Sequence, residues 1–254
     1  LSKGASAIIS SKRVKYKNHK IPLILVKDVR KSLTEACSNF YKKKPLNIIA
    51  VTGTNGKSSV ADFFYQILSL NKISAASIGT FGILSKNYNQ KTNLTSMDPL
   101  FLHKNLQILA TNKVNYVILE ASSHGLEQKR LDNLNIDIGI FTNFSHDHLD
   151  YHKNMQSYFN SKMYLFKNLL KKNSKIITDE DNKEFKIIKK IANRRSIKKI
   201  TIGSSSGNIK ILHNKYKQNK QVVKISINSN IIKLEVPLIG YFQVKNLFMA
   251  ILAA

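Results

Sequence analysis

Apolar residues along this chain form two kinds of pattern. Short continuous apolar runs bounded by turn residues are typical of buried strands, whereas apolar residues that recur every three to four positions are typical of helices. The runs predict strands at Ala5–Ser10, Ile21–Val26, Leu46–Val51, Ser74–Ile78, Tyr116–Leu119, Ile136–Phe141, Lys175–Thr178 and Lys199–Ile202. The periodic stretches predict helices at Val29–Tyr41, Pro99–Thr111, Met155–Leu170, Asn182–Ala192 and Gln243–Ala254, and one more that ends near Leu70. This alternation predicts βαβ units on a mainly parallel sheet with flanking helices, an α/β fold.

The pattern changes between residues 208 and 236. Apolar and polar residues now alternate with a period of two, in the segments Ile209–Leu212, Val222–Ile227 and Ile231–Val236. The segment Asn228–Asn230 carries turn residues between the last two. A period of two is typical of strands with one buried face. We therefore expect a β meander on the edge of the α/β domain.

Composition limits the class of protein. The chain has 254 residues, of which 43% are hydrophobic, so it can bury a core and is not disordered as a whole. A single cysteine, Cys37, excludes an internal disulfide framework and a cysteine-based zinc cluster, and it fits a reducing compartment such as the cytoplasm. No apolar run approaches the roughly 18–20 residues that span a bilayer. The basic start, 1–20, has no uninterrupted apolar segment, so we expect no signal peptide.

The charge has two explanations. The chain has 41 Lys+Arg and 15 Asp+Glu, a formal net charge of +26, and this excess is typical of proteins that bind nucleic acid or anionic membranes. However, lysine, isoleucine and asparagine are all abundant here, and the three share A/T-rich codons. The basic residues are also spread over most of the chain. We therefore favour a solvated surface with a compositional bias, and we expect no nucleic-acid partner.

A phosphate-binding loop is the strongest local signal. The residues Gly53–Ser58, Gly-Thr-Asn-Gly-Lys-Ser, follow the predicted buried strand and open the predicted helix. Glycines let backbone N–H groups approach phosphate oxygens, Lys57 reaches the terminal phosphates, and the Ser58 hydroxyl can ligate Mg²⁺. The loop departs from the usual spacing, because Val51 stands where a glycine is expected six residues before the lysine. Strand, loop, lysine and hydroxyl together still predict nucleotide binding rather than an ordinary turn.

The loop resembles that of the Mur ligase and folylpolyglutamate synthase superfamily, which forms amide bonds by ATP-driven carboxylate activation. Four further segments resemble motifs of the MurE-type ligases, the UDP-N-acetylmuramoyl-tripeptide synthetases. They are Glu120–Leu126 followed by Gln128 and Arg130, then Thr142–His152, then Asn93–Pro99, and finally Gly240–Asn246, with Gln243 where the family has asparagine. These segments identify the chain as a member of that family over nearly its whole length.

The resemblance implies roles for individual residues. ATP would bind at Gly53, Thr54, Asn55, Gly56, Lys57, Ser58, Ser59 and Asn246. Mg²⁺ would be held by Ser58, Glu120, His148 and Lys162, the last as a CO₂-derived carbamate, since an ammonium cannot ligate a cation. The muramoyl-peptide would contact Thr95, Ser96, Ser122, Gln128 and Arg130, whose donors suit an anionic substrate. The catalytic residues would be Lys57, Lys162 and His148.

Simpler interpretations stand beside several of these roles. Glu120 ends a predicted buried strand at the sheet edge where ligands bind, but it could equally form a local ion pair. Histidines and aspartates between His146 and His152 could instead form a zinc or di-metal hydrolase site. Without the resemblance, Lys162 would be an exposed helix lysine. We expect His124 and His152 to be structural hydrogen-bonding groups rather than catalysts.

The implied reaction adds a diamino acid, meso-diaminopimelate or lysine, to UDP-N-acetylmuramoyl-L-alanyl-D-glutamate through an acyl phosphate. It belongs to peptidoglycan precursor synthesis in the bacterial cytoplasm, and we expect a monomer. Two other activities stay open, namely a folylpolyglutamate synthase-like ligase and a basic P-loop ATPase that acts on nucleic acid. A third possibility is a remnant that binds nucleotide without turnover.

Domain organisation is predicted from the family's three domains. We expect 1–44 to be the remnant of the N-terminal UDP-binding domain and 45–254 to be the central ATP-binding domain, with the C-terminal ligase domain absent. Residue 1 is Leu rather than Met, and the last predicted helix ends without a stop signal. We therefore expect a fragment that binds ATP weakly and does not complete ligation alone.

Overall fold

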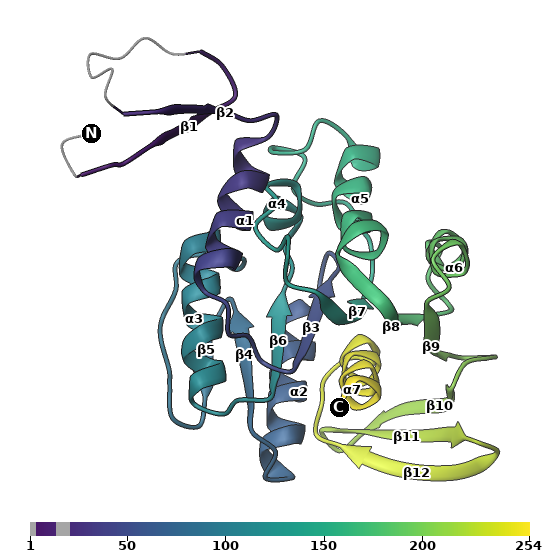
Figure 1. Ribbon diagram of the computed structural model, residues 1–254. Coiled ribbons are helices and arrows are strands. Elements are labelled where there is room, and N and C mark those ends of the chain that lie inside the picture. Colours follow the sequence, from purple (N-terminus) through teal and green to yellow (C-terminus); the bar gives the residue numbers. More distant parts are fainter. Residues whose placement is uncertain (1–3, 14–20) are drawn as a thin grey trace.

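A ten-stranded sheet forms the centre of the protein in the computed structural model, which describes residues 4–13 and 21–254 (Figure 1). The strand order is β12-β11-β10-β9-β8-β7-β3-β6-β4-β5. Six neighbouring strands are parallel: β3 (Asn47–Thr52), β4 (Ala75–Gly79), β6 (Tyr116–Glu120), β7 (Ile136–Phe141), β8 (Leu170–Asp179) and β9 (Lys198–Gly203). β5 (Gly82–Ser85) closes one edge antiparallel to β4. The predicted mainly parallel α/β fold is confirmed.

The predicted meander is also confirmed at the other edge. β10 (Ile209–Lys217) joins β9 in parallel, and β11 (Lys220–Ile227) and β12 (Asn230–Val236) follow it antiparallel. Asn228 and Ser229 form the last turn with positive φ angles of 48° and 69°. A two-residue turn of this kind matches the twist of paired strands. The meander therefore extends the sheet rather than forming a separate layer.

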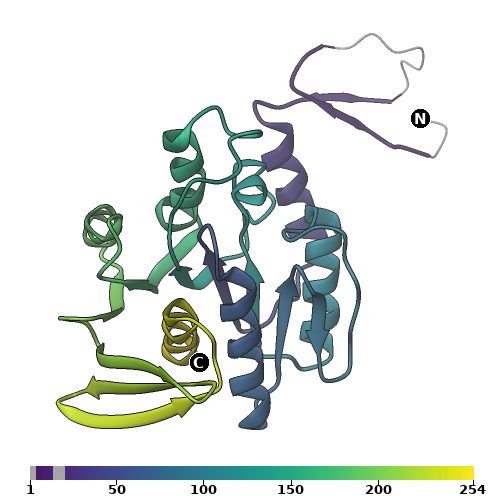
Figure 2. The ribbon, with the colours of Figure 1, turned by 180° about the vertical axis from the view of Figure 1, so that it is seen from behind.

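Helices cover both faces of the parallel part of the sheet (Figures 1 and 2). On one face α2 (Lys57–Leu70) and α7 (Tyr241–Ala253) pack on a core that includes Val51, Phe64 and Phe248. On the other face lie α3 (Pro99–Thr111), α4 (Ser123–Glu127), α5 (Met155–Tyr164) and α6 (Phe185–Arg194), and α1 (Val29–Phe40) packs against α3. The strands between the two layers are buried on both sides, which explains their continuous apolar runs.

The predicted helix Met155–Leu170 is helical as far as Leu169, but its last part is a π-helix rather than an α-helix. α5 ends at Tyr164, a π-helical turn follows over Leu165–Leu169, and β8 begins at Leu170. The apolar residues after Tyr164 are buried in the core, as a helix would bury them, but Leu170 already pairs with Ile136 of β7. The apolar run therefore does not show where the α-helix changes to a π-helix or where the strand begins.

Other boundaries also differ from the sequence prediction. The strand expected at Lys175–Thr178 is the second half of the ten-residue β8. The helix expected to begin at Asn182 begins at Phe185, and the Asn182 side chain donates a hydrogen bond to the carbonyl of Thr142 at 2.9 Å. Neither β5 nor α4 was predicted, since four and five residues are too few to show a period.

The N-terminal segment forms a separate small sheet. β1 (Ile8–Ser10) and β2 (Leu23–Leu25) pair in parallel beyond the end of α1 (Figure 1). Residues 1–3 and 14–20 of the expected N-terminal remnant lie outside the described residues. In the part of the chain that the structure describes, no helix is long and apolar enough to cross a membrane.

Candidate functional site

The phosphate loop lies at the carboxyl end of β3, in the middle of the sheet. Gly56 is the N-cap of α2 with a φ of +86°, a conformation that favours glycine. A Cβ at Gly56 would lie 2.7 Å from Oδ1 of Asn246, and a Cβ at Gly53 would overlap the hydroxyl of Thr142. The two glycines therefore permit the turn itself. They also allow α7 and the segment that follows β7, which we call the β7 loop, to pack closely against the phosphate loop. The first N–H groups of α2 are left to face a ligand.

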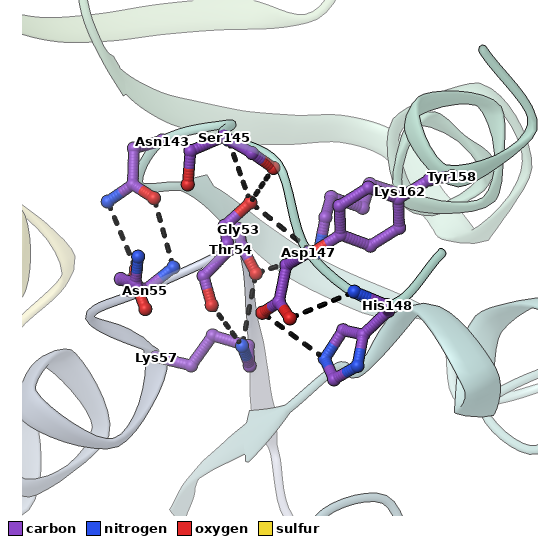
Figure 3. A network of polar contacts seen from close by, with 10 residues as sticks. All are labelled: Gly53, Thr54, Asn55, Lys57, Asn143, Ser145, Asp147, His148, Tyr158 and Lys162. Atoms are coloured by element: carbon purple, nitrogen blue, oxygen red, sulfur yellow. Dashed lines mark hydrogen bonds and ion pairs between the residues drawn. The ribbon is translucent and has the colours of Figure 1, made fainter. Parts of the chain in front are cut away.

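The segment after β7 holds this loop in place (Figure 3). The backbone N–H of Thr54 donates to the carbonyl of Asn143 at 2.9 Å, and that of Asn55 donates to the Asn143 side chain at 2.9 Å. The Asn143 amide returns a bond to the carbonyl of Asn55 at 3.1 Å, and the N–H of Ser145 donates to Oγ1 of Thr54 at 3.0 Å. Asn143 and Ser145 thus fix the shape of the loop, a role that the sequence did not show for them.

Two lysines share one carbonyl oxygen of the loop (Figure 3). Nζ of Lys57 donates to the carbonyls of Gly53 at 3.0 Å and Thr54 at 2.9 Å. Nζ of Lys162, on α5, donates to the same Gly53 carbonyl at 2.8 Å and lies 4.3 Å from the centroid of the Tyr158 ring. Lys162 is 1% exposed, so it is not the surface helix lysine that its sequence context alone would suggest.

Burial changes the protonation of both lysines. It lowers the pKa of Lys162 to about 6, and the charge of Lys57 acts in the same direction, while Asp147 opposes both. Burial also lowers the pKa of Lys57, against the opposing effects of Glu120 and Asp147. At neutral pH most Lys162 side chains therefore carry an uncharged amine, which is the form that can react with an electrophile.

Glu120 is a buried carboxylate held by hydroxyl and amide donors. It is 3% exposed, and Oε2 accepts hydrogen bonds from the hydroxyls of Ser58 at 2.8 Å and Thr80 at 3.2 Å, while Oε1 accepts the Thr80 N–H at 2.8 Å. No ion pair among the described residues involves Glu120, which argues against the local ion-pair interpretation. A buried carboxylate beside a serine hydroxyl on a phosphate loop has the hard oxygen ligands that Mg²⁺ takes.

His148 lines the same cavity as Glu120 and has a positive φ of 52°. Its N–H donates to Oδ1 of Asp147 at 2.8 Å, and its Nε2 lies 3.6 Å from Oδ2 of the same carboxylate. The zinc or di-metal interpretation of the segment from His146 to His152 has no support, because the described part of the chain contains no group of three or more His, Cys, Asp or Glu side chains placed to hold a metal.

His124 and His152 pack in a group of rings beside the site. The ring of His124 lies 3.8 Å from that of Tyr151, and the ring of His152 lies 5.1 Å from that of Tyr158. His152 is 3% exposed, and its Nδ1 lies 3.5 Å from a carboxylate oxygen of Glu127. Burial lowers the pKa of both histidines. Among the described residues neither side chain makes a hydrogen bond, and Nε2 of His152 is buried without a partner, so the contacts fit a packing role rather than the hydrogen-bonding role that we expect for the pair.

The sequence-predicted residues meet around one cavity of about 470 Å³. Its lining includes Thr54, Asn55, Gly56, Lys57, Ser58, Glu120, His148 and Lys162 on the nucleotide and metal side, and Thr95, Ser96, Ser122, Gln128 and Arg130 on the expected substrate side. Thr80, which the sequence did not single out, also lines it. Gly53, Ser59 and Asn246 do not line this cavity, although the Gly53 carbonyl accepts hydrogen bonds from Lys57 and Lys162, which do.

The residues on the expected substrate side form hydrogen bonds with one another. Nη1 of Arg130 donates to the carbonyl of Ser96 at 2.6 Å, and its Nη2 donates to Oε1 of Gln128 at 2.6 Å. Oγ of Ser96 donates to the carbonyl of Glu120 at 2.8 Å and accepts the N–H of Ser122 at 2.8 Å. Ser96 therefore couples the substrate side to the strand that carries Glu120.

Asn246 lies in an adjoining cavity of about 330 Å³ that also reaches Asn143. Its amide donates to Oε1 of Gln243 at 3.1 Å, so the residue that departs from the family motif contacts Asn246 directly. The same cavity contains Lys245, whose Nζ forms ion pairs with Asp179 at 2.6 Å and Asp181 at 3.1 Å. These ion pairs attach the first turn of α7 to the end of β8.

A comparison with protein families matches residues 51–254 to the Mur ligase middle domain. The chain belongs to the Mur ligase family. A relative from Rickettsia montanensis is 40% identical over 257 residues, which cover 100% of this chain and 53% of that protein. It is named UDP-N-acetylmuramoyl-L-alanyl-D-glutamate–2,6-diaminopimelate ligase. This Mur ligase chain thus spans about half the length of the curated relatives it matches.

Solved structures show the same Mur ligase fold. A ligase with the same name as the Rickettsia relative superposes with a TM-score of 0.86 at 30% identity, covering 100% of this chain and 52% of that one. An FPGS–AMPPCP–folate complex superposes with a TM-score of 0.69 at 14% identity, covering 89% of this chain and 61% of that one. At 14% identity, the similarity to the FPGS complex shows a shared fold and no more.

Proposed function

We propose that this chain is the ATP-binding part of a ligase that adds diaminopimelate to UDP-N-acetylmuramoyl-L-alanyl-D-glutamate in peptidoglycan precursor synthesis. The observation that carries the proposal is the buried carboxylate of Glu120 beside Ser58 on the phosphate loop, within one cavity with Lys57. The names of relatives at about 40% identity support diaminopimelate rather than lysine as the amino acid. A reaction that consumes ATP and a UDP-linked acceptor belongs in the bacterial cytoplasm.

Nucleotide binding follows from the loop. The N–H groups at the start of α2 face the phosphates, and Lys57 turns from the loop carbonyls to the terminal phosphates. Ser58 and Glu120 would hold Mg²⁺, with His148 in the same cavity. The bound ion neutralises charge on the phosphates. Asn246, beside Gly56 and the second cavity, would contact the base.

Lys162 would act as a carbamate. Its neutral amine at pH 7 is the form that can combine with CO₂, and its place beside the Gly53 carbonyl brings the product next to the loop. The reaction forms an N–C bond and releases the amine proton, so that a negative charge then lies beside the positive charge of Lys57. Lys162 would then add oxygen ligands to those of Ser58 and Glu120.

The acceptor would occupy the side of the cavity lined by Thr95, Ser96, Ser122, Gln128 and Arg130. Its glutamyl carboxylate attacks the γ-phosphorus of ATP, which forms an acyl phosphate and releases ADP. The amine of the amino acid then attacks the acyl carbon, and phosphate leaves as the amide bond forms. Lys57 and Arg130 supply the positive charge that orients these anionic groups, so catalysis depends mainly on positioning and electrostatics.

Glu120→Gln tests the proposal in the gene product that contains this chain. We expect tripeptide formation from ATP, Mg²⁺, the UDP-linked dipeptide and diaminopimelate to fall by about 10²–10³-fold, the scale of a lost metal ligand. Mass spectrometry measures the product, and titration with ATP in the presence and absence of Mg²⁺ measures nucleotide affinity. The matched control is Glu35→Gln on the exposed side of α1, which removes the same charge away from the cavity.

Three results would contradict the proposed function. The first is wild-type protein that forms no ATP-dependent tripeptide, and the second is full activity in Glu120→Gln. The third is a preference for a folate acceptor over the UDP-linked dipeptide, which would favour the folylpolyglutamate synthase-like alternative.

A further inference from the structure

The meander formed by β10, β11 and β12 presents one face that none of the described helices covers (Figures 1 and 2). Its inner side chains, such as Val223 and Ile225, are buried in the core beside α7. The residues of opposite parity point away from that core, and we call their surface the outer meander face. Lys224 on β11 and Lys233 on β12 lie at the centre of this face and are exposed.

Strand register gathers lysines on the outer meander face. Six exposed lysines share the parity of Lys224, namely Lys210, Lys215, Lys217, Lys220, Lys224 and Lys233. These residues are separated by up to 23 positions in the sequence, so the sequence shows no block of charge. Pairing of three strands nevertheless places them on a single surface.

The positive charges of this face are not balanced. Lys224 is the direct cross-strand partner of Lys233 and, on its other side, of His213. Like charges directly opposite each other destabilise a sheet. Among the described residues, only Lys220 of the six lysines has an acidic group within ion-pair distance, Glu235 at 3.8 Å, and both side chains of that pair are exposed.

Acidic residues are also scarce in the surrounding sequence. From Phe185 to Ala254 the chain contains a single acid, Glu235. Among the acids that come shortly before this segment, Asp179 and Asp181 are engaged with Lys245 at the end of β8, and Glu180 accepts the hydroxyl of Thr201 at 2.6 Å. These residues therefore offer little to neutralise the outer meander face, and they leave it complementary to an anionic surface.

We propose that the outer meander face binds an anionic phospholipid surface. An aliphatic side chain lies among the lysines, since Ile231 on β12 pairs with Ser226 on this face and is 60% exposed, and Leu212, unpaired at the nearby β-bulge, is 46% exposed. This mixture fits a membrane interface, where lysines approach lipid phosphates and apolar side chains enter the headgroup region.

Nucleic acid fits the same face less well. Lysines can bind the phosphates of either polyanion, but proteins that contact bases use arginine forks for base edges or aromatic rings for stacking. The outer meander face has no arginine. Tyr216 of β10 pairs with Gln221, which is buried, so Tyr216 belongs to the inner face of the meander and not to the outer one. The face therefore lacks the groups that grip bases and retains those that suit lipid.

Lys224→Glu tests the proposal by flotation with lipid vesicles. We expect the full chain to bind vesicles that contain about 30% phosphatidylglycerol and to dissociate from them at high salt. We expect it not to bind vesicles of pure phosphatidylcholine. One positive charge near an anionic lipid surface changes the affinity for vesicles about fivefold. Replacement of a lysine by a glutamate changes the charge by two units, so it should lower this affinity about 25-fold. The matched control is Lys42→Glu, an exposed lysine between α1 and β3, which should retain most of the binding.

The same variant separates binding from folding. The introduced carboxylate would face Lys233 and His213, so Lys224→Glu should keep or raise the thermal midpoint while it loses vesicle binding. Ile231→Ser should also weaken binding to vesicles, because it removes a largely exposed aliphatic group from the face.

Three outcomes would overturn the proposal. They are equal binding to neutral and anionic vesicles, equal loss in Lys224→Glu and Lys42→Glu, and an absence of vesicle binding. Fluorescence anisotropy with single-stranded and duplex DNA in the same buffer measures whether the face binds nucleic acid, the other candidate polyanion. DNA binding that depends on Lys224, without vesicle binding, would assign the face to nucleic acid instead.

Discussion

At the scale of single residues, His103 is a buried base with no partner in the described structure. It is 0% exposed on α3, and neither ring nitrogen has a hydrogen-bond partner among the described groups. Burial lowers the pKa of His103 to about 4, and the positive charge of Lys44 adds to the effect. The folded protein therefore keeps this imidazole neutral at a pH where the unfolded chain protonates it.

His103→Leu should flatten the acid side of the stability profile. Between pH 6.5 and 4 the unfolded chain binds a proton that the folded chain does not, so stability falls as the pH falls, by up to about 3 kcal/mol. Urea unfolding at a series of pH values measures this slope. Leu102→Met in the same helix should shift stability equally at all pH values, and an unchanged acid slope in His103→Leu would contradict the assignment.

Residue roles were only partly predictable. The loop residues from Gly53 to Ser58 could be found because backbone approach to phosphate requires small residues at fixed spacing. Lys162 is one of 41 basic residues, and only the resemblance singled it out, since its burial arises from packing of α5 on the loop. Thr80 was missed because a single hydroxyl after a strand carries no pattern, although it bonds both oxygens of Glu120.

At the scale of elements, α3 has a complete start signal. Asp98 caps it by accepting the N–H of Phe101 at 3.0 Å, and Pro99 occupies the first helical position. Proline fits there because its missing N–H would have had no partner in the helix. The predicted and observed bounds, Pro99–Thr111, agree for this reason.

Asp98→Ala should therefore lower the free energy of unfolding by about 1 kcal/mol, the usual cost of a lost N-cap. Denaturant titration measures the change. Asp98→Asn is the control, because its side-chain oxygen still accepts the Phe101 N–H. Equal losses in the two variants would show that the cap bond does not contribute.

The predicted element boundaries differ from the observed ones where tertiary pairing decides the structure. The apolar run that includes Leu165 and Leu170 supports a helix by period, but Leu170 pairs with Ile136 and starts a strand. A π-helical turn absorbs the change of geometry between them. No local pattern encodes the position of β7, so the end of the helical segment near Leu170 was predictable but the π-helix and the strand that starts there were not.

At the scale of the whole molecule, fold class and net charge were predictable but the distribution of charge was not. Lysines that are spread along the sequence come together on the outer meander face because strand register aligns them. The site, by contrast, brings the carboxylates of Glu120 and Asp147 close enough to Lys57 to act on its pKa. The charge is therefore more localised than the sequence suggested.

A net charge of +26 should make stability depend on salt. Repulsion among exposed lysines is screened once the Debye length falls to about 8 Å at about 0.15 M. We expect the thermal midpoint to rise between about 20 and 300 mM NaCl, by about 2–4 °C for each kcal/mol of repulsion relieved. An uncharged osmolyte at equal osmolality is the control, and a midpoint that falls with NaCl would contradict the expectation.

The hydrogen bonds between the phosphate loop and the β7 loop have a kinetic consequence. The amides of Thr54, Asn55 and Ser145 all donate across the same junction, so we expect them to become exposed together when the junction opens. In native-state hydrogen exchange these three amides should thus exchange with a common opening free energy. The two loops would open and close as one unit, although 91 positions separate Thr54 from Ser145 in the chain.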